Sequence, residues 1–194
     1  MLSFLAILLC YLVGSFPTGV VISKRKYGLD VREVGSGNIG ATNITRVFGW
    51  YAGFLTFLID FLKGAVPLWL MQLFFSEAPW VVTAGGICLV VGHCYSLFLG
   101  FKGGKGVATS LGCLMVTLPV CALIYGLVYL VLLKLSRISA VGSLGGVVAA
   151  IIYLILRWPG MAPGSLVLML CIIVLIRHQE NIQRLIETFK SRRN

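Results

Sequence analysis

Long apolar runs, separated by short polar segments, make up most of this chain and decide what it can fold into. A helix needs about 20 apolar residues to cross the hydrocarbon core of a membrane. Candidates for such helices lie at 2–23, 49–73, 80–98, 139–157 and 164–176. Of the 194 residues, 59% are hydrophobic and only 11% are charged, whereas soluble domains carry about 25% charged residues. We therefore expect an all-α integral membrane protein in which residues 1–194 form a single polytopic domain.

The apolar run at 107–133 is long for one crossing and short for two, and Pro119 lies near its centre. Two lysines precede this run, and a lysine and an arginine follow it. A single helix would place these charges on opposite sides of the membrane, whereas a turn at 118–119 would place all of them in the cytosol, as the positive-inside rule prefers. We therefore expect two short helices here, and seven transmembrane helices in all.

Basic residues outside the apolar runs are distributed unevenly between the expected loops. The turns at 74–79, 118–119 and 158–163 hold no Lys or Arg, although Arg157 lies at the edge of the last one. The alternate loops and the tail hold Lys24, Arg25, Lys26, Arg32, Arg46, Lys102, Lys105, Lys134, Arg137, Arg177, Arg184, Lys190, Arg192 and Arg193. We therefore expect the N-terminus outside and the C-terminus in the cytosol.

The net charge of +10 follows mainly from this topology and from attraction to anionic lipid headgroups. We expect membrane lipid as a partner and no nucleic acid, while protein partners cannot be predicted. The same topology places three polar segments on the cytosolic side, at 35–43, 100–106 and 177–185. Their convergence favours one shared site.

The segment at 35–43 alternates glycine with short hydrogen-bond donors, and an arginine follows it. Backbone N–H groups and hydroxyls arranged in this way can surround an anion. A plain loop with a helix cap is the alternative interpretation. The candidate substrate-binding residues here are Ser36, Gly37, Asn38, Thr42, Asn43 and Arg46.

The segment at 100–106 combines glycines with two lysines, a composition that suits a phosphate nest. It is not a nucleotide P-loop, because Leu99 and Gly106 stand where that motif requires Gly and Ser or Thr. A loop that only fixes topology is the alternative. The candidates here are Lys102, Gly103, Gly104, Lys105 and Gly106, with His93 as either a site residue or an ordinary interfacial histidine.

The segment at 177–185 is predicted to continue a helix beyond the membrane. Arg177, Asn181 and Arg184 would then share one face at i, i+4 and i+7. The arginines suit a phosphate, His178 suits proton transfer and Asn181 suits the positioning of a hydroxyl. An amphipathic tail lying on the bilayer surface is the alternative.

Few charged or metal-binding residues lie elsewhere in the apolar runs. Asp60 and Lys63, at i and i+3, are interpreted as a structural ion pair within a span. Ser139 and Ser143, one turn apart at a cytosolic helix start, are candidates for lining the same cavity. The six cysteines form no C-x-x-C pair and carboxylates are scarce, so we expect no metal and no other cofactor.

The three polar segments, in this order in a seven-helix chain of this length, resemble those of the bacterial membrane acyl-phosphate:glycerol-3-phosphate acyltransferases. That family is characterised by SGNxGATN, GHxxxxFxxFKGGKGxAT and HxxNIxRL. This sequence reads SGNIGATN at 36–43, GHCYSLFLGFKGGKGVAT at 92–109 and HQENIQRL at 178–185. The resemblance covers the whole chain, with no departure inside the motifs.

The resemblance implies transfer of a fatty acyl group from acyl phosphate to the sn-1 hydroxyl of glycerol 3-phosphate. The products would be lysophosphatidic acid and phosphate, in the first acylation of phospholipid synthesis. The enzyme would lie in the bacterial cytoplasmic membrane with its active site facing the cytosol. The polar segments suit two phosphate-bearing substrates, with Lys105, His178 and Asn181 as the candidate catalytic residues.

Acyl phosphate is already activated, so positioning and charge stabilisation can suffice without an acyl-enzyme. Either His178 or a phosphate oxygen of the donor takes the hydroxyl proton. A secondary transporter for an anionic solute is the alternative from another class of protein. The chain shows no internal repeat, and its polar segments gather on one side of the membrane, so an enzyme is favoured.

Overall fold

The computed structural model describes residues 1–191, and within them the chain is helical with no β-strand. The α-helices are α1 (Leu2–Ser15), α2 (Thr18–Tyr27), α3 (Ala41–Phe48), α4 (Trp50–Phe74), α5 (Pro79–Cys94), α6 (Val107–Thr117), α7 (Pro119–Ser136), α8 (Ser139–Leu156), α9 (Met161–Arg177) and α10 (Gln179–Ser191). Two short 3₁₀ helices, η1 (Val31–Glu33) and η2 (Leu97–Leu99), lie in the loops. The all-α prediction is confirmed. Residues 192–194, expected in the cytosol with the rest of the tail, lie outside the described residues.

Among residues 1–191, five helical segments are long and apolar enough to cross a membrane. They are Leu2–Tyr27, Trp50–Phe74, Pro79–Leu99, Pro119–Ser136 and Ser139–Leu156. The bent pair α9 and α10 adds a sixth if it is counted as one span, and α6 is a shorter apolar helix. These segments fall where the apolar runs predicted them.

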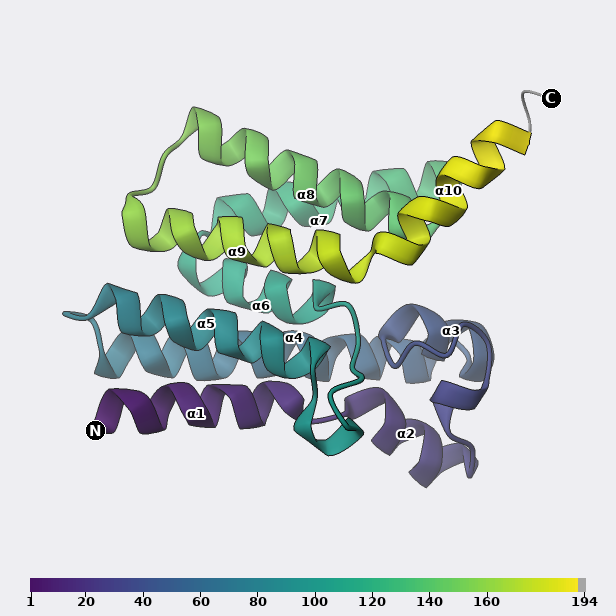
Figure 1. Ribbon diagram of the computed structural model, residues 1–194, viewed down its shortest axis with the longest axis horizontal. Helices are drawn as coiled ribbons and strands as arrows, with labels where there is room; N and C mark the ends of the chain where they lie inside the picture. Colours follow the sequence, from purple (N-terminus) through teal and green to yellow (C-terminus); the bar gives the residue numbers. More distant parts are fainter. Residues whose placement is uncertain (192–194) are drawn as a thin grey trace.

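The first expected span, 2–23, is broken between α1 and α2. Pro17 lies at the break, where it offers no N–H group and disfavours a helical conformation at Phe16. Phe16 accordingly has an extended ψ of 120°. The chain continues in α2 as far as Tyr27, and the polar loop that follows returns to α3 beside the end of α4 (Figure 1).

The expected turn at 118–119 is confirmed. α6 ends at Thr117 and α7 begins at Pro119, with Leu118 in a non-helical conformation between them. Proline suits the first position of a helix and restricts the residue before it, which explains the break at this point. The chain reverses direction here, so that α6 and α7 form an antiparallel hairpin (Figure 1).

The long helices lie side by side, with α1 against α5, α4 against α6 and α7 against α8 (Figure 1). The N-terminus lies at one end of this bundle. The opposite end holds α2, α3, the loop between α5 and α6, and α10 (Figure 1). The three polar segments therefore gather at one end of the bundle, as the sequence predicted.

Glycines bring two of these helix pairs into backbone contact. A Cβ atom at Gly64 would lie 2.2 Å from a backbone oxygen of α6, and one at Gly112 would lie 2.1 Å from a backbone oxygen of α4. Gly14 and Gly92 meet the opposite backbones of α5 and α1 in the same way. Small residues at such crossings let membrane helices pack closely.

We predict that Gly112→Ala lowers the free energy of unfolding by about 1–3 kcal/mol, the usual cost of overpacking. The added methyl would meet the α4 backbone, which cannot turn aside as a side chain can. Gly126→Ala is the matched control, because a Cβ at Gly126 meets nothing within 4 Å. Thermal unfolding in detergent measures both variants. Equal melting temperatures would contradict the prediction.

Candidate active site

Asn43 organises the first polar loop. Its side chain is buried, and Nδ2 donates to the backbone oxygens of Val34 and Asn38, each at 3.0 Å. Its Oδ1 accepts from the backbone N–H of Ser36 at 2.9 Å. We had expected Asn43 to bind an anion, but both ends of its amide group are engaged by the loop. The structure thus gives Asn43 the task of shaping this loop.

The other candidate residues of this loop remain at its surface. The Oδ1 of Asn38 accepts from the N–H of Gly40 at 2.8 Å, which closes the turn just before α3. Ser36, Thr42 and Arg46 are exposed. Gly37 has a φ of +70°, a left-handed conformation that glycine adopts readily.

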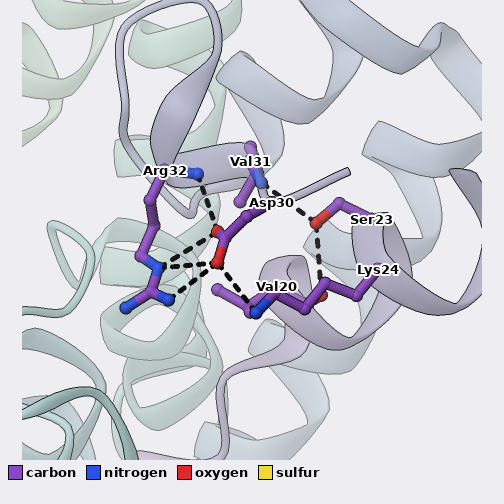
Figure 2. A network of polar contacts seen from close by, with 6 residues as sticks. All are labelled: Val20, Ser23, Lys24, Asp30, Val31 and Arg32. Carbon is purple, nitrogen blue, oxygen red and sulfur yellow. Dashed lines mark hydrogen bonds and ion pairs between the residues drawn. The ribbon is translucent and has the colours of Figure 1, made fainter. Parts of the chain in front are cut away.

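A second network holds the start of the same loop against α2 (Figure 2). Asp30 accepts from the Arg32 guanidinium at 2.7 Å and pairs with Lys24 at 3.0 Å. The hydrogen bonds from Arg32 hold the pKa of Asp30 well below its usual range. The Ser23 hydroxyl accepts from the N–H of Val31 at 3.2 Å. The one acidic group of this network is therefore shared by two cations.

The glycine loop before α6 is held against the end of α5 by backbone hydrogen bonds. The N–H groups of Gly103 and Gly104 donate to the carbonyls of Cys94 and His93, both at 3.0 Å. The carbonyls of these two glycines accept from the Arg177 guanidinium, also at 3.0 Å each. The N–H groups of Gly103 and Gly104, expected to form a phosphate nest, are thus bonded to carbonyls of α5 in this structure. Arg177, expected to hold a phosphate, uses two of its donors to clamp the loop.

Lys105 projects from this loop and meets the third polar segment. Its ammonium group donates a hydrogen bond to Oδ1 of Asn181. Gly106, the next residue, has a φ of +81° and leads directly into α6. Lys102 is exposed, and no described contact joins it to Lys105. The structure thus brings together two of the three predicted catalytic residues.

The third segment is not the continuous helix that we expected. α9 ends at Arg177 and α10 begins at Gln179, with a bend of 57° between them. The His178 side chain causes the break by competing with the backbone. Its Nδ1 lies 2.8 Å from the Val174 carbonyl, while its own N–H donates to Leu175 at 3.0 Å, one residue closer than in a regular helix.

The same contact fixes which nitrogen of His178 can accept a proton. A carbonyl only accepts, so neutral His178 carries its hydrogen on Nδ1, and the lone pair lies on Nε2. His178 is 2% exposed. The structure therefore presents Nε2 as the acceptor of a buried, oriented imidazole.

Positive charge from three separate segments gathers around Lys105. Burial lowers the pKa of Lys105, and the nearby charges of Arg184, Arg177 and Arg46 lower it further, while Glu180 opposes them. Arg184 lies 4.0 Å from Glu180. Lys105 and three arginines, against one carboxylate, give this region a net positive charge, so it attracts anions.

Hydroxyl groups from α8 and α7 adjoin the first loop. The Ser139 hydroxyl lies 3.0 Å from that of Thr42 and 3.1 Å from that of Tyr129. Ser143, the residue predicted to line the cavity, donates within its own helix to the Ser139 carbonyl at 3.0 Å. Sequence reasoning missed Tyr129. Tyr129 lies ten residues before Ser139, across the turn between two helices. This spacing could have indicated that the two side chains meet.

Arg177 has a second contact that the sequence did not indicate, since its guanidinium lies 5.1 Å from the centre of the Tyr95 ring. His93, at the end of α5, is buried with 4% of its surface exposed. Within residues 1–191, no three His, Cys, Asp or Glu side chains lie together as a metal site would require.

The fold and the site define a multi-pass membrane protein with a cluster of cations where its polar loops meet. A family model described as glycerol-3-phosphate acyltransferase matches residues 4–188, and the chain belongs to this family. The glycerol-3-phosphate acyltransferase of Aquifex aeolicus is 40% identical over 180 residues, covering 93% of both chains. That of Myxococcus xanthus is 43% identical over 179 residues, covering 92% of this chain and 93% of the relative.

Two solved structures share the fold. The glycerol 3-phosphate form of PlsY, an integral membrane glycerol 3-phosphate acyltransferase, has a TM-score of 0.92 and 38% identity, covering 97% of this chain and 94% of that one. The lysophosphatidic acid form has a TM-score of 0.90 and 37% identity, covering 97% and 93% of the two chains.

Proposed function

We propose that this protein transfers a fatty acyl group from acyl phosphate to the sn-1 hydroxyl of glycerol 3-phosphate, giving lysophosphatidic acid and phosphate. The observation that carries the proposal is the group of cations around Lys105, contributed by all three polar segments. Family membership supports glycerol 3-phosphate as the acceptor. The forms in which PlsY was solved, with glycerol 3-phosphate and with lysophosphatidic acid, match a substrate and a product of this reaction.

Acyl phosphate is the donor that the resemblance to the acyl-phosphate-dependent family implies, and the chemistry of the site is compatible with it. Acyl phosphate is a mixed anhydride whose leaving group is a phosphate, so it needs charge stabilisation more than a nucleophilic residue. Lys105 would neutralise the donor phosphate, and Arg46 would hold the phosphate of glycerol 3-phosphate. The exposed Arg46 side chain suits a substrate that arrives from water.

The reaction is a direct displacement. The glycerol 3-phosphate hydroxyl oxygen attacks the acyl carbon, the bond from that carbon to the phosphate oxygen breaks, and phosphate leaves. In the bound substrate the hydroxyl donates its hydrogen bond to Nε2 of His178, which orients it. As the oxygen attacks, the hydroxyl hydrogen turns to a donor phosphate oxygen, which takes the proton. Asn181, whose Oδ1 holds Lys105, keeps its NH₂ group for a substrate oxygen.

The proposed enzyme crosses the bacterial cytoplasmic membrane seven times, with its N-terminus outside and its active site in the cytosol. The crossings are α1, α4, α5, α6, α7, α8 and α9, and the polar segments share the end of the bundle opposite the N-terminus (Figure 1). The basic loops at that end support a cytosolic orientation.

We predict that a cysteine placed at Leu118, in a cysteine-free background, is labelled only from outside the cell. Leu118 lies at the turn between α6 and α7, at the opposite end of the bundle from the polar loops. A cysteine in the exposed Leu135–Arg137 region should be labelled from the cytosol. Labelling of position 118 from the cytosol would overturn the proposed α6–α7 crossing pair.

We predict that purified protein forms lysophosphatidic acid and phosphate in equal amounts from acyl phosphate and glycerol 3-phosphate. Lys105→Ala should lose about 10²–10³-fold in rate, the usual cost of removing a preorganised charged donor. Lys134→Ala, which removes an exposed lysine away from the site, is the matched control. Acylation from acyl-CoA but not from acyl phosphate would disprove the proposal that acyl phosphate is the donor. Near-normal activity of Lys105→Ala would leave this lysine only a topological role.

The same assay has a pH dependence with a definite sign. Burial and neighbouring cations lower the pKa of Lys105. As the pH rises, its ammonium group therefore loses its charge earlier than an ordinary lysine, whose pKa is about 10.4. The ratio kcat/KM, which reports the free enzyme, should fall as the pH rises through that pKa. Lys105→Arg keeps its charge over this range, so any activity it retains should lack this alkaline limb.

We predict that His178→Ala loses roughly 10²–10⁴-fold in rate, and that His178→Gln recovers much of it. An amide oxygen can accept the hydrogen bond that orients the hydroxyl, although it cannot take the proton at neutral pH. The measurement is a pH–rate profile of both variants and wild type at saturating donor. An acidic limb present in wild type but absent from an active His178→Gln variant would make His178 the base.

A further inference from the structure

A charged pair on α4 lies buried inside the bundle and belongs to none of the three polar segments. The predicted ion pair is present, with Lys63 Nζ 2.8 Å from Asp60 Oδ1, and the two side chains are 5% and 3% exposed. The Thr18 hydroxyl donates to the same Asp60 oxygen at 2.8 Å, and Lys63 donates to the Phe16 carbonyl at 2.9 Å. The pair on α4 therefore holds both sides of the break between α1 and α2.

His93 lies between the charged pair and the glycine loop. Nδ1 of His93 lies 3.7 Å from Asp60 Oδ1 and has no hydrogen-bond partner among the described residues. The ring lies directly beneath the loop, because a Cβ atom at Gly104 would lie 2.2 Å from Nε2 of His93. The N–H of Gly104 also donates to the His93 carbonyl at 3.0 Å. The position of His93 thus determines how closely the loop that carries Lys105 approaches α5.

The side of the pair that faces the helix break leads to the first polar loop. Gly19 follows Thr18 in α2, and a Cβ atom there would lie 1.9 Å from the carbonyl oxygen of Ile39. This backbone contact leaves no space for α2 to shift without moving the 35–43 loop. The anchoring of Thr18 and Phe16 by the charged pair therefore also sets the position of this loop.

The cost of burying this pair makes a purely structural role a poor explanation. Two charges inside a membrane-spanning helix are expensive, and apolar residues of similar size commonly stabilise a protein as well as a buried ion pair does. Lys63 alone would neutralise Asp60. The contacts with Thr18, Phe16 and His93 instead connect the pair to both substrate loops.

We propose that Asp60 and Lys63 are positioning residues for acyl transfer, which fix the Lys105 loop and the 35–43 loop relative to each other through His93 and the α1–α2 break. This inference rests on the proposed function, in which the two loops hold different substrate phosphates. The separation of the loops then decides whether the attacking hydroxyl meets the acyl carbon. A misplacement of about 1 Å can cost about 10²-fold in rate.

Kinetics of Asp60→Asn and Lys63→Gln test the proposal. We expect kcat/KM for both substrates to fall by about 10²-fold in folded protein. Thr83→Val is the control for a structural defect, because its buried hydroxyl donates to the Ala162 carbonyl at 3.0 Å, in the other half of α5. It should lower the melting temperature and leave both kcat/KM values unchanged. Asp60→Asn behaving like Thr83→Val, or losing activity toward one substrate only, would overturn the proposal.

A double-mutant cycle separates action through His93 from general damage. If Asp60 acts through His93, Asp60→Asn should cost much less in a His93→Gln background than in wild type. Independent, multiplicative losses would contradict the proposal. Thr18→Val keeps both charges and removes one hydrogen bond to Asp60, so it replaces Asp60→Asn as the test if that variant does not fold. We expect it to lower kcat/KM about tenfold. Wild-type activity in Thr18→Val would contradict the proposal. Wild-type protein that forms no lysophosphatidic acid would disprove the function instead.

Discussion

Every backbone N–H and C=O group near the membrane core needs a partner, and this requirement governs each place where a helix of this bundle stops. Side chains supply partners at two of the breaks and in two of the polar loops. Lys63 donates a hydrogen bond to the Phe16 carbonyl, and His178 Nδ1 donates to the Val174 carbonyl. Arg177 donates to two carbonyls of the glycine loop. Asn43 does the same for the first loop. Many of the polar residues at the end of the bundle are therefore present because the backbone there is irregular.

This division separates residues that build the site from residues with free chemical capacity. The amide group of Asn43 is engaged by backbone groups on both sides, and Arg177 uses Nε and Nη2 on the glycine loop. Lys105, Arg46 and Nε2 of His178 retain charge or a lone pair for a substrate. These groups, with the charge that Arg177 adds beside Lys105, supply what the proposed reaction needs. The clamp of Arg177 on the glycine loop places Lys105 among them, so the two groups of residues depend on each other.

The sequence predicted the helical spans, the turn at Pro119 and the gathering of the polar segments, because hydrophobic length, proline and charge alternation act locally along the chain. It failed where a side chain reaches a distant backbone group. The contact of Arg177 with the glycine loop joins residues 73 and 74 positions apart. The break at His178 depends on an imidazole competing with its own helix, and amphipathic spacing alone favours a continuous helix there. Motif residues were thus identified more easily than their individual roles.

The scarcity of acidic groups near the site is as important for the proposed reaction as the presence of cations. Asp30 is shared by Lys24 and Arg32, and Asp60 is neutralised by Lys63, so neither repels an incoming phosphate strongly. Acyl transfer between two phosphate-bearing substrates leaves two anionic products. In the proposed reaction, a site at the end of the bundle would let phosphate leave to water while the acylated product leaves along the membrane. A cluster of partly solvated cations suits this order of product release. A fully buried charge would bind the departing phosphate too tightly for turnover.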